Sequence, residues 1–461
     1  MKHIKALCLL ITLVLMSFSC SALAQSASLP ENEKVLRIVK GELYAMTWPE
    51  AFVAFATQHP DVKIMSIEKG LEDSGEIMMA MTTGSEVADL YAIHISSGLA
   101  ALKDKGFVTN LSSSSILKDT IATFYPFLQE VVTHEGKIIG FPAYFYLHAW
   151  AVDQKRWDAM GLGPIPVTFA EYIKKLEEWN KTYGQEKEIV FMEARTTKAD
   201  LMEGLLERYI LQNETAESPL SFNVLDFRNA AELVLRMEEG IAEDRESNEY
   251  LNRPLLLTAY PQPLGKEDYG GYQLLPAQLI LPPQVSSNKP PAVYGDLEVL
   301  VVNPRSPSKE LALSFLECMA QHIPSAFRIQ FNPNENVPVV APVSLQKAQT
   351  YQEQLSKYEK NLSATHDDKK KDLEQAIAQL QAKLDAALQD HMISPEEIAA
   401  YRAVAPYTAF GERSQFLGYG DRDAFESLMA AARRYLDGQM SLDQYIAEID
   451  GIARLLFLEE Q

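Results

Sequence analysis

Hydrophobic periodicity divides the first third of the chain into alternating strands and helices. Short apolar runs bounded by turn residues predict strands, and they fall at 34–41, 61–70 and 88–94. Apolar residues three or four apart predict helices between and after them, at 48–60, 74–84 and 99–106. This strand–helix alternation indicates a parallel sheet with helices on its faces.

The pattern becomes more helical after residue 150. The segment 167–184 has a capping box, because Thr168 is followed three residues later by Glu171. Further helices are predicted at 198–212 and 226–240. The segment 296–323 predicts a strand, a turn and a helix, with Ser306 or Ser308 as the N-cap.

The stretch 344–392 contains no glycine or proline, and its apolar residues repeat with a 4-3-4 spacing on both sides of a polar turn at 363–368. This pattern predicts an antiparallel helical hairpin. Each arm is too short for a free coiled coil, so we expect the hairpin to pack on the body or on a partner. The alternative is an insertion with no binding role.

The segment 425–457 predicts two amphipathic helices broken at Asp437 and Gly438. Ser441 and Gln444 form a second capping box before the second of these helices.

Residues 1–24 have the pattern of a secretory signal peptide. Two lysines precede an apolar run that ends in the small-residue motif Ala22-Leu23-Ala24, typical of a cleavage site. We therefore expect an exported protein, secreted or held at the cell surface or in the periplasm. Cys20 leaves open a second interpretation, in which this cysteine is lipidated and anchors the chain to a membrane. The residues before Cys20 depart from the usual lipoprotein signal, which has a leucine three positions earlier.

Length and charge narrow the class of protein. At 461 residues the chain is long enough for two or three domains or one bilobal unit. A net charge of −21 argues against nucleic acid and anionic membranes as partners. Cys318 is the one cysteine beyond residues 1–24, and Cys20 would remain in the mature chain only in the lipidated form. We therefore expect no internal disulfide and a sizeable apolar core.

No motif for catalysis stands out in the sequence. It has no phosphate-binding glycine loop, no nucleophile elbow and no zinc-protease motif. The histidines are scattered, and His94, His134 and His148 have no neighbour at metal-ligand spacing. We therefore expect no enzyme activity, no cofactor and no metal, although carboxylates that meet only in space would escape this search.

Several segments, in order, resemble the extracellular solute-binding proteins of ABC importers, in the group that includes the maltose- and other sugar-binding proteins. The resemblance rests on the signal peptide and on four later segments, at 88–112, 136–179, 297–317 and 435–450. It implies a bilobal α/β fold of the periplasmic-binding-protein type, into which the helical hairpin is inserted. The implied division is 25–145 for the first segment of lobe one, 146–283 for lobe two, 284–333 for the return to lobe one, and 334–461 for C-terminal helices of lobe two, hairpin included.

The resemblance also places a ligand site at the hinge. The aromatic stretch after Gly140 would line the bottom of a cleft, where sugars stack on aromatic rings; we assign Phe141 and Phe145 to the core. The expected ligand contacts are Tyr44, Trp48, His94, Tyr144, Tyr146, Trp150, Glu193, Arg195, Tyr260, Tyr294 and Asp296, with Glu42 and Ser96 beside them.

The implied function is capture of a small solute by hinge closure, followed by delivery to ABC permease subunits. A sugar or oligosaccharide is favoured because of the aromatic residues, and we expect a monomer. Two other classes remain open: an exported enzyme on the same bilobal fold, and an adhesion or partner-binding protein built around the helical hairpin.

Overall fold

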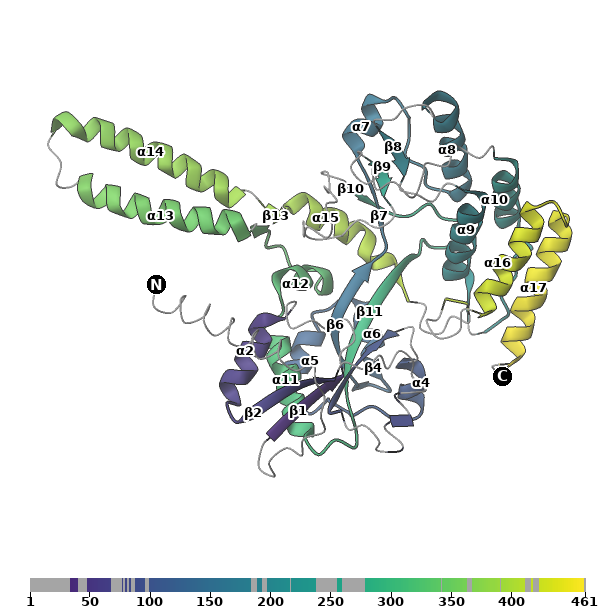
Figure 1. Cartoon of the computed structure of the whole chain (residues 1–461), viewed down its shortest axis with the longest axis horizontal. Coiled ribbons are helices and arrows are strands. Elements are labelled where there is room, and N and C mark those ends of the chain that lie inside the picture. Colours follow the sequence, from purple (N-terminus) through teal and green to yellow (C-terminus); the bar gives the residue numbers. More distant parts are fainter. Residues whose placement is uncertain are drawn as a thin grey trace, which may run out of the picture.

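The structure of the chain is a computed structural model. It describes residues 34–39, 48–67, 77, 79–80, 83, 88–95, 99–183, 189–192, 197–215, 217–237, 255–258, 278–340, 342–362, 367–389, 391–410, 416–417 and 423–459. Two α/β lobes and a projecting pair of helices make up this part of the chain (Figure 1).

Lobe one is built on a six-stranded mixed sheet in the order β14-β11-β3-β1-β2, with β6 paired to β11. β1 runs parallel to β2 and β3, and β11 runs antiparallel to β3 and β6. The strands are β1 (Lys34–Val39), β2 (Val62–Ile67), β3 (Leu90–His94), β6 (Phe141–Leu147), β11 (Val293–Val302) and β14 (Thr408–Ala409). The parallel strands predicted at the start of the chain are therefore confirmed.

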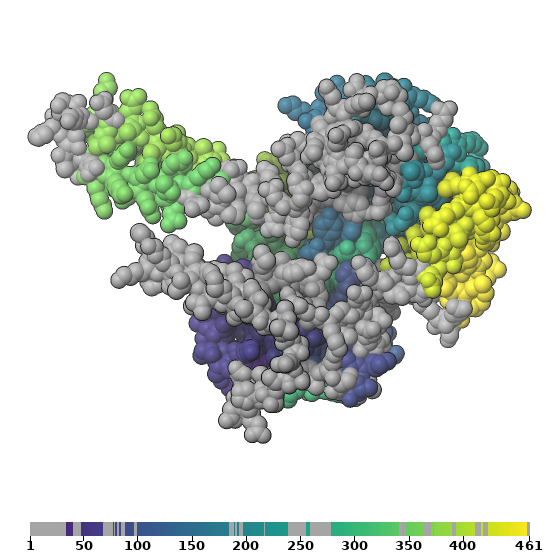
Figure 2. Space-filling view, viewed as in Figure 1, coloured from purple at the N-terminus to yellow at the C-terminus, as the bar shows by residue number. Residues whose placement is uncertain are grey.

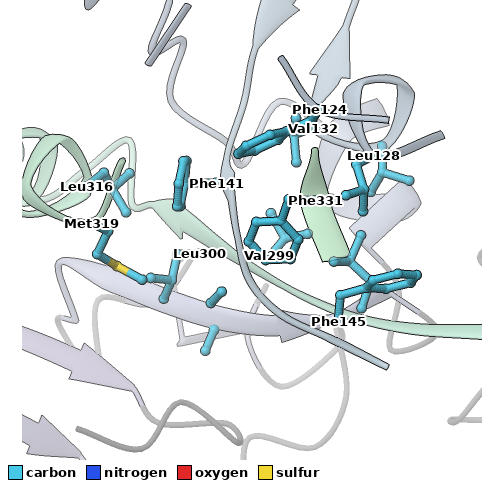
Figure 3. Close-up of a cluster of buried hydrophobic side chains, with 14 of the residues drawn as sticks. Phe124, Leu128, Val132, Phe141, Phe145, Val299, Leu300, Leu316, Met319 and Phe331 are labelled. Atoms are coloured by element: carbon cyan, nitrogen blue, oxygen red, sulfur yellow. The ribbon is translucent and has the colours of Figure 1, made fainter. Parts of the chain in front are cut away.

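The described helices and small hairpin that pack on this sheet include α2 (Pro49–Gln58), α4 (Leu99–Asp104), α5 (Ser115–Ile121), α6 (Pro126–Val131), α11 (Lys309–Gln321), α12 (Ser325–Phe331), and the strands β4 (Thr133–His134) and β5 (Lys137–Ile138). Their apolar faces meet in one core. Phe124 contacts both Phe141 and Phe331 there, with ring centroids 6.0 and 5.3 Å apart (Figure 3).

One of the two serines expected to cap α11 is at its N-cap. Ser308 occupies the N-cap position but makes no side-chain capping bond. The Ser306 hydroxyl instead donates to Asp89 Oδ1 at 2.5 Å and accepts the Ser308 N–H at 2.9 Å. Since Asp89 also accepts the N–H of Arg37, the Ser306 hydroxyl connects the start of α11 to Asp89, just before β3, and through it to β1.

Lobe two has a four-stranded sheet in the order β10-β7-β9-β8 and a separate apolar core. Its strands are β7 (Trp150–Val152), β8 (Val190–Met192), β9 (Leu255–Thr258) and β10 (Gln278–Ile280). Its helices are α7 (Gln154–Ala159), α8 (Phe169–Tyr183), α9 (Lys198–Asn213), α10 (Leu225–Arg236), α16 (Asp423–Leu436) and α17 (Leu442–Glu459).

Both predicted capping boxes of lobe two are present. Glu171 accepts the N–H of Thr168 at 3.0 Å, and the Thr168 hydroxyl accepts the N–H of Glu171 at 3.2 Å. Ser441 and Gln444 make the same reciprocal pair before α17, at 2.8 and 3.3 Å. Each pair satisfies two N–H groups at a helix start that have no partner within the helix.

Strands β6 and β11 run from one lobe toward the other (Figure 1). β6 ends at Leu147 and β7 of lobe two begins at Trp150, so only His148 and Ala149 separate the two sheets at this crossing. β14 runs parallel to the first residues of β11 and leads to α16 and α17 of lobe two. These crossings form the joint between the lobes.

The boundary of the last segment differs from the expectation at 334. Helix α15 (Pro395–Val404) places Ile398, Tyr401 and Val404 in the apolar core of lobe one. Among the described residues after 334, those in the core of lobe two begin at Phe416. Tyr401 holds α15 in lobe one, because its side chain is fully buried there and its hydroxyl donates to the Gln330 carbonyl.

The predicted helical hairpin corresponds to α13 (Pro342–Leu362) and α14 (Asp367–Gln389), which we call the arm. The two helices pack on each other through a small cluster of Ala348, Leu355, Leu380, Leu384 and Ala387. The arm projects away from both lobes (Figures 1 and 2). Its described residues therefore do not pack along the body. Packing on a partner and an insertion with no binding role stay predictions.

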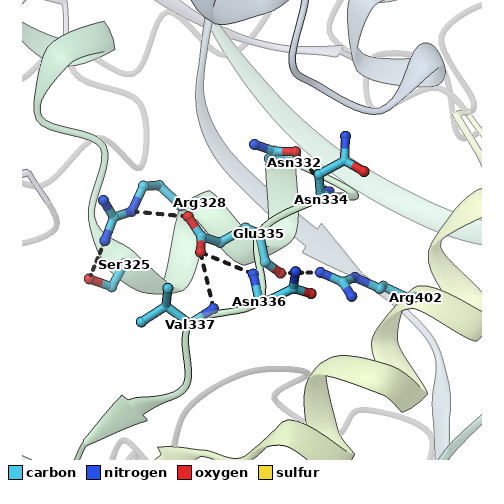
Figure 4. Close-up of polar contacts among 8 residues, drawn as sticks. All are labelled: Ser325, Arg328, Asn332, Asn334, Glu335, Asn336, Val337 and Arg402. Atoms are coloured by element: carbon cyan, nitrogen blue, oxygen red, sulfur yellow. Dashed lines mark hydrogen bonds and ion pairs between the residues drawn. The ribbon is translucent and has the colours of Figure 1, made fainter.

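The base of the arm is fixed to lobe one. β12 (Val339–Val340) pairs with β13 (His391–Ile393), and the turn before β12 is held by Glu335, whose carboxylate accepts the N–H groups of Asn336 and Val337. The same carboxylate lies 3.8 Å from Arg328 of α12, and Arg402 of α15 donates to the Glu335 carbonyl (Figure 4). These contacts join the root of the arm to α12 and α15.

No helix among the described residues is long and apolar enough to cross a membrane.

Candidate functional site

The two crossing strands carry polar and aromatic side chains on one face and apolar side chains on the other. Alternation along β6 leaves Tyr144 and Tyr146 partly exposed and buries Phe141 and Phe145. In the antiparallel register Tyr146 pairs with Asp296, and Tyr144 pairs with Glu298. We call the set on the first side the polar face: His94, Tyr144, Tyr146, His148, Tyr294, Asp296 and Glu298.

At the centre of the polar face, one carboxylate is shared by two histidines. His148 Nε2 lies 2.7 Å from Asp296 Oδ2, and His94 Nε2 lies 3.3 Å from Asp296 Oδ1. The three side chains are 24–25% exposed, so water still reaches them. They come from β3, from β11 and from the joint after β6, and we call them the triad.

Aromatic rings surround His148 on both sides. Its ring lies edge to face with Tyr146 and Tyr294, with centroid distances of 4.8 and 5.1 Å. Its backbone N–H donates to the Tyr294 carbonyl at 2.9 Å. His148 is thus held to β11 through both its backbone and its side chain.

The pKa of Asp296 is well below its usual value of 3.8. Burial alone would raise this pKa, but the hydrogen bonds from His148 and His94 outweigh burial, because they favour the ionised carboxylate. Asp296 therefore stays an anion throughout the physiological pH range.

This shift predicts the pH dependence of an Asp296→Asn variant. A lowered pKa in the folded state stabilises the protein above the unfolded-state pKa near 3.9, and the stabilisation disappears as pH falls through the folded-state pKa. We expect the variant to lose about 2 kcal/mol of unfolding free energy at pH 6–7. Urea unfolding measures this loss, and the gap to the wild type should shrink below about pH 4. An equal gap at pH 7 and pH 3 would contradict the assignment.

The polar face continues beyond the triad toward α12. Glu298 is 3% exposed, and it lies opposite His94 on β3 as well as Tyr144 on β6. Tyr144 lies edge to face with Phe327 of α12, with centroids 6.4 Å apart. The partly exposed residues of this face therefore combine the Asp296 carboxylate, two imidazoles and tyrosine rings, which can accept and donate hydrogen bonds to a polar solute and contact its apolar side, whereas Glu298 is buried.

Two aromatic residues expected at the site lie in the cores instead. Trp48 has no exposed surface, and its indole N–H donates to the Ala143 carbonyl at 2.8 Å. Trp150 is 3% exposed in the core of lobe two, where the Arg208 guanidinium lies 4.8 Å from its ring centroid. Neither indole is available to a solute in this structure, because the packing of each lobe needs it.

The structure brings together five of the expected residues: His94, Tyr144, Tyr146, Tyr294 and Asp296. Other expected positions lie outside the described residues, namely Cys20, Glu42, Tyr44, Ser96, Glu193, Arg195 and Tyr260. They stay predictions.

Two residues of the polar face were missed in the sequence. His148 was set aside as an isolated histidine, although it continues the alternation of Tyr144 and Tyr146 by one more step of two residues. Glu298 likewise follows Asp296 by two positions within an apolar strand. A charged residue within a buried strand is unusual and was the available signal.

Among the described residues, no group of three or more histidine, cysteine, aspartate or glutamate side chains is arranged to hold a metal ion.

Comparison with solved structures supports the bilobal fold. The chain is similar to the sugar-binding protein MalE from Xanthomonas citri, with a TM-score of 0.56 and 14% identity over 93% of this chain and 98% of that one. It is also similar to an ABC substrate-binding protein from Listeria monocytogenes in complex with cycloalternan, with a TM-score of 0.54 and 14% identity over 91% and 98%. A sugar transporter from Rhizobium etli in an open conformation gives a TM-score of 0.55 and 16% identity over 91% and 99%.

No family model matches the sequence, and no curated protein matches it. At these low identities the likeness shows the fold, which is the bilobal fold expected from the sequence.

Proposed function

We propose that the protein is an exported solute receptor. It captures a small hydroxyl-rich solute, a sugar or an oligosaccharide, between its lobes and delivers it to an ABC permease. The observation that carries this proposal is the polar face on β6 and β11, where Asp296, two histidines and Tyr146 meet on the strands that join the lobes.

The chemistry of the polar face suits such a solute. Binding sites commonly combine aromatic walls with a few polar groups that fix orientation. The faces of Tyr144, Tyr146 and Tyr294 supply the walls, and Asp296 supplies an acceptor for hydroxyl groups. The solved proteins that share the fold include a sugar-binding protein, a substrate-binding protein in complex with cycloalternan and a maltose-bound protein.

The proposed mechanism is closure about the crossing strands. A solute that contacts both lobes binds the closed form more tightly than the open form, and this difference alone shifts the population toward closure. The closed form is then the one that a permease would recognise. No covalent step is required. The signal segment at 1–24, with or without lipidation at Cys20, would place the receptor outside the cytoplasm.

Thermal unfolding of residues 25–461 against a panel of solutes tests the proposal. The panel contains maltose, cycloalternan, ribitol, other mono- and oligosaccharides, and, as contrasting classes, peptides and polyamines. A solute present at about 1,000 times its Kd adds about 4 kcal/mol to the unfolding free energy. We expect at least one carbohydrate to raise the melting temperature by several degrees.

Matched variants connect any shift to the polar face. Tyr146→Ala should remove most of the shift, whereas Tyr358→Ala, on the exposed surface of the arm, should leave it unchanged. A shift that survives Tyr146→Ala would place the solute elsewhere. Consumption of the solute would favour an enzyme, and a panel with no carbohydrate hit would overturn the sugar assignment.

A further inference from the structure

The segment between β10 and β11 is fastened to lobe two although it has no regular structure. We call residues 281–292 the second crossing, because they connect β10 of lobe two to β11 of lobe one. The N–H of Gln284 donates to the Val167 carbonyl at 2.9 Å, and its carbonyl accepts the Phe169 N–H of α8 at 2.8 Å. Val285, the next residue, is buried in the core of lobe two.

The side chain of Gln212, near the end of α9, holds the same segment. Its amide oxygen accepts the N–H groups of Val285 and Ser286 at 3.2 and 2.9 Å. Its amide nitrogen donates to the carbonyls of Ser286 and Pro290 at 2.9 and 3.2 Å. One side chain therefore supplies partners for four backbone groups of the second crossing, which neither a helix nor a strand satisfies.

Two further side chains extend the attachment to the end of the second crossing. Asp226 of α10 accepts the N–H and the hydroxyl of Ser287 at 2.9 and 2.8 Å. Within the crossing, the Gln284 amide oxygen accepts the Ala292 N–H at 2.9 Å. Because Ala292 directly precedes β11, the second crossing is held by lobe two as far as its last residue.

Beyond Ala292 the chain is held by lobe one. Val293 and Tyr294 pair with β14, and Gly295 pairs with Leu147 of β6. The attachments to the two lobes therefore meet between the second crossing and the first residue of β11. Little slack remains there for the lobes to move against each other.

Helix α9 also contacts the other route between the lobes. The Arg208 guanidinium lies 4.8 Å from the ring centroid of Trp150, the first residue of β7. Arg208 precedes Gln212 by four positions, and residues four apart lie on the same face of a helix. One face of α9 therefore braces both connections where they enter lobe two.

We propose that Gln212 is a positioning residue for the movement of the lobes. By fixing the second crossing to α9, it makes this segment move with lobe two and confines bending to the residues at 148–149 and 292–293. Without the Gln212 amide the crossing would be slack, and the lobes would sample a wider range of relative positions. Resting on the proposed function, solute capture would then weaken, because closure would have to order the crossing again.

Distances between spin labels on the protein without solute test the proposal. Labels on the exposed Asp119 of α5 and the exposed Lys181 of α8 report the separation of the lobes. We expect Gln212→Ala to widen the distance distribution about two-fold relative to the wild type, because the crossing no longer limits the joint.

Hydrogen exchange gives a second readout that a purely local role would not change. The Ala292 N–H donates to Gln284 rather than to Gln212, so its protection falls only if the crossing loosens as a whole. We expect Gln212→Ala to lower this protection about ten-fold.

Two matched variants separate positioning from a general loss of stability. At pH 7 Gln212→Glu keeps the acceptor but not the donor, so it should widen the distribution by less than alanine does. Gln129→Ala removes amide bonds of 2.7 and 3.4 Å to two backbone carbonyls within lobe one and should leave both readouts unchanged. A wild-type distribution in Gln212→Ala, or equal widening in Gln129→Ala, would overturn the proposal. Neither result would bear on the solute panel.

Discussion

Replacing Gly140 with alanine is expected to be among the most damaging single changes in the crossing between the lobes. A Cβ atom at this position would lie 2.5 Å from Val299 Cγ1 and 2.9 Å from the Leu300 carbonyl oxygen, both on β11. The second contact is with backbone, which cannot rotate away. The strand must therefore shift, and we expect a loss of about 3 kcal/mol in unfolding free energy.

The same shift should also displace the polar face. Gly140 immediately precedes β6, and β6 sets the register that places Tyr146 opposite Asp296. We therefore expect Gly140→Ala to reduce the thermal shift given by any solute that binds wild-type protein. Urea unfolding and the solute panel measure the two effects on one preparation.

Gly451→Ala is a matched control of the opposite sign. Gly451 lies inside α17, and no heavy atom lies within 4 Å of the Cβ that alanine would add. Alanine in a helix interior is favoured over glycine by about 0.5–1 kcal/mol, so this variant should be slightly more stable than the wild type. Equal stability losses in the two variants would mean that packing at Gly140 is not the cause.

Truncation of Trp48 has the second large expected effect, and it separates a core role from a ligand role. The indole packs against Phe327 and Phe141, with centroids 5.5 and 6.1 Å away, and it bonds the Ala143 carbonyl. We expect Trp48→Ala to cost about 3–5 kcal/mol, because it opens a cavity and leaves a buried carbonyl without its donor. Urea unfolding followed by circular dichroism gives this value.

Two further variants complete the comparison. Trp48→Phe keeps most of the buried ring and should fold even if the alanine variant does not; its response to the solute panel should match that of the wild type. Tyr144→Ala, on the polar face, should lose less stability and more of the solute response. If Trp48→Phe lost the solute response while keeping its stability, the ligand role expected from the sequence would stand after all.

Many elements of the fold were predictable because their signals are local. The alternation of the first strands and helices depends on spacing within each segment, and both capping boxes in lobe two need only residues three positions apart. The elements that were missed are short or rely on distant contacts. Helix α15, for example, is ten residues long and acquires its place from Tyr401 in the core of lobe one.

The candidate site was predicted only in part, for a related reason. Period-two alternation in β6 separates Phe145 from Tyr144 and Tyr146, and the structure shows that division. The alternation within β6 does not indicate which strand pairs with β6. Asp296 and His148 are 148 positions apart in the chain, and only the antiparallel pairing of β6 with β11 places them 2.7 Å apart.

The sequence by itself therefore determined the order and type of most elements and the helical arm, because periodicity, caps and turn residues act over a few positions. The tertiary structure alone decided that the two tryptophans expected at the site, Trp48 and Trp150, support the cores. Trp48 and Tyr144 look equally suited to a solute in the sequence, yet one is fully buried and the other is not. Burial and register depend on how distant strands pack, and no local pattern specifies them.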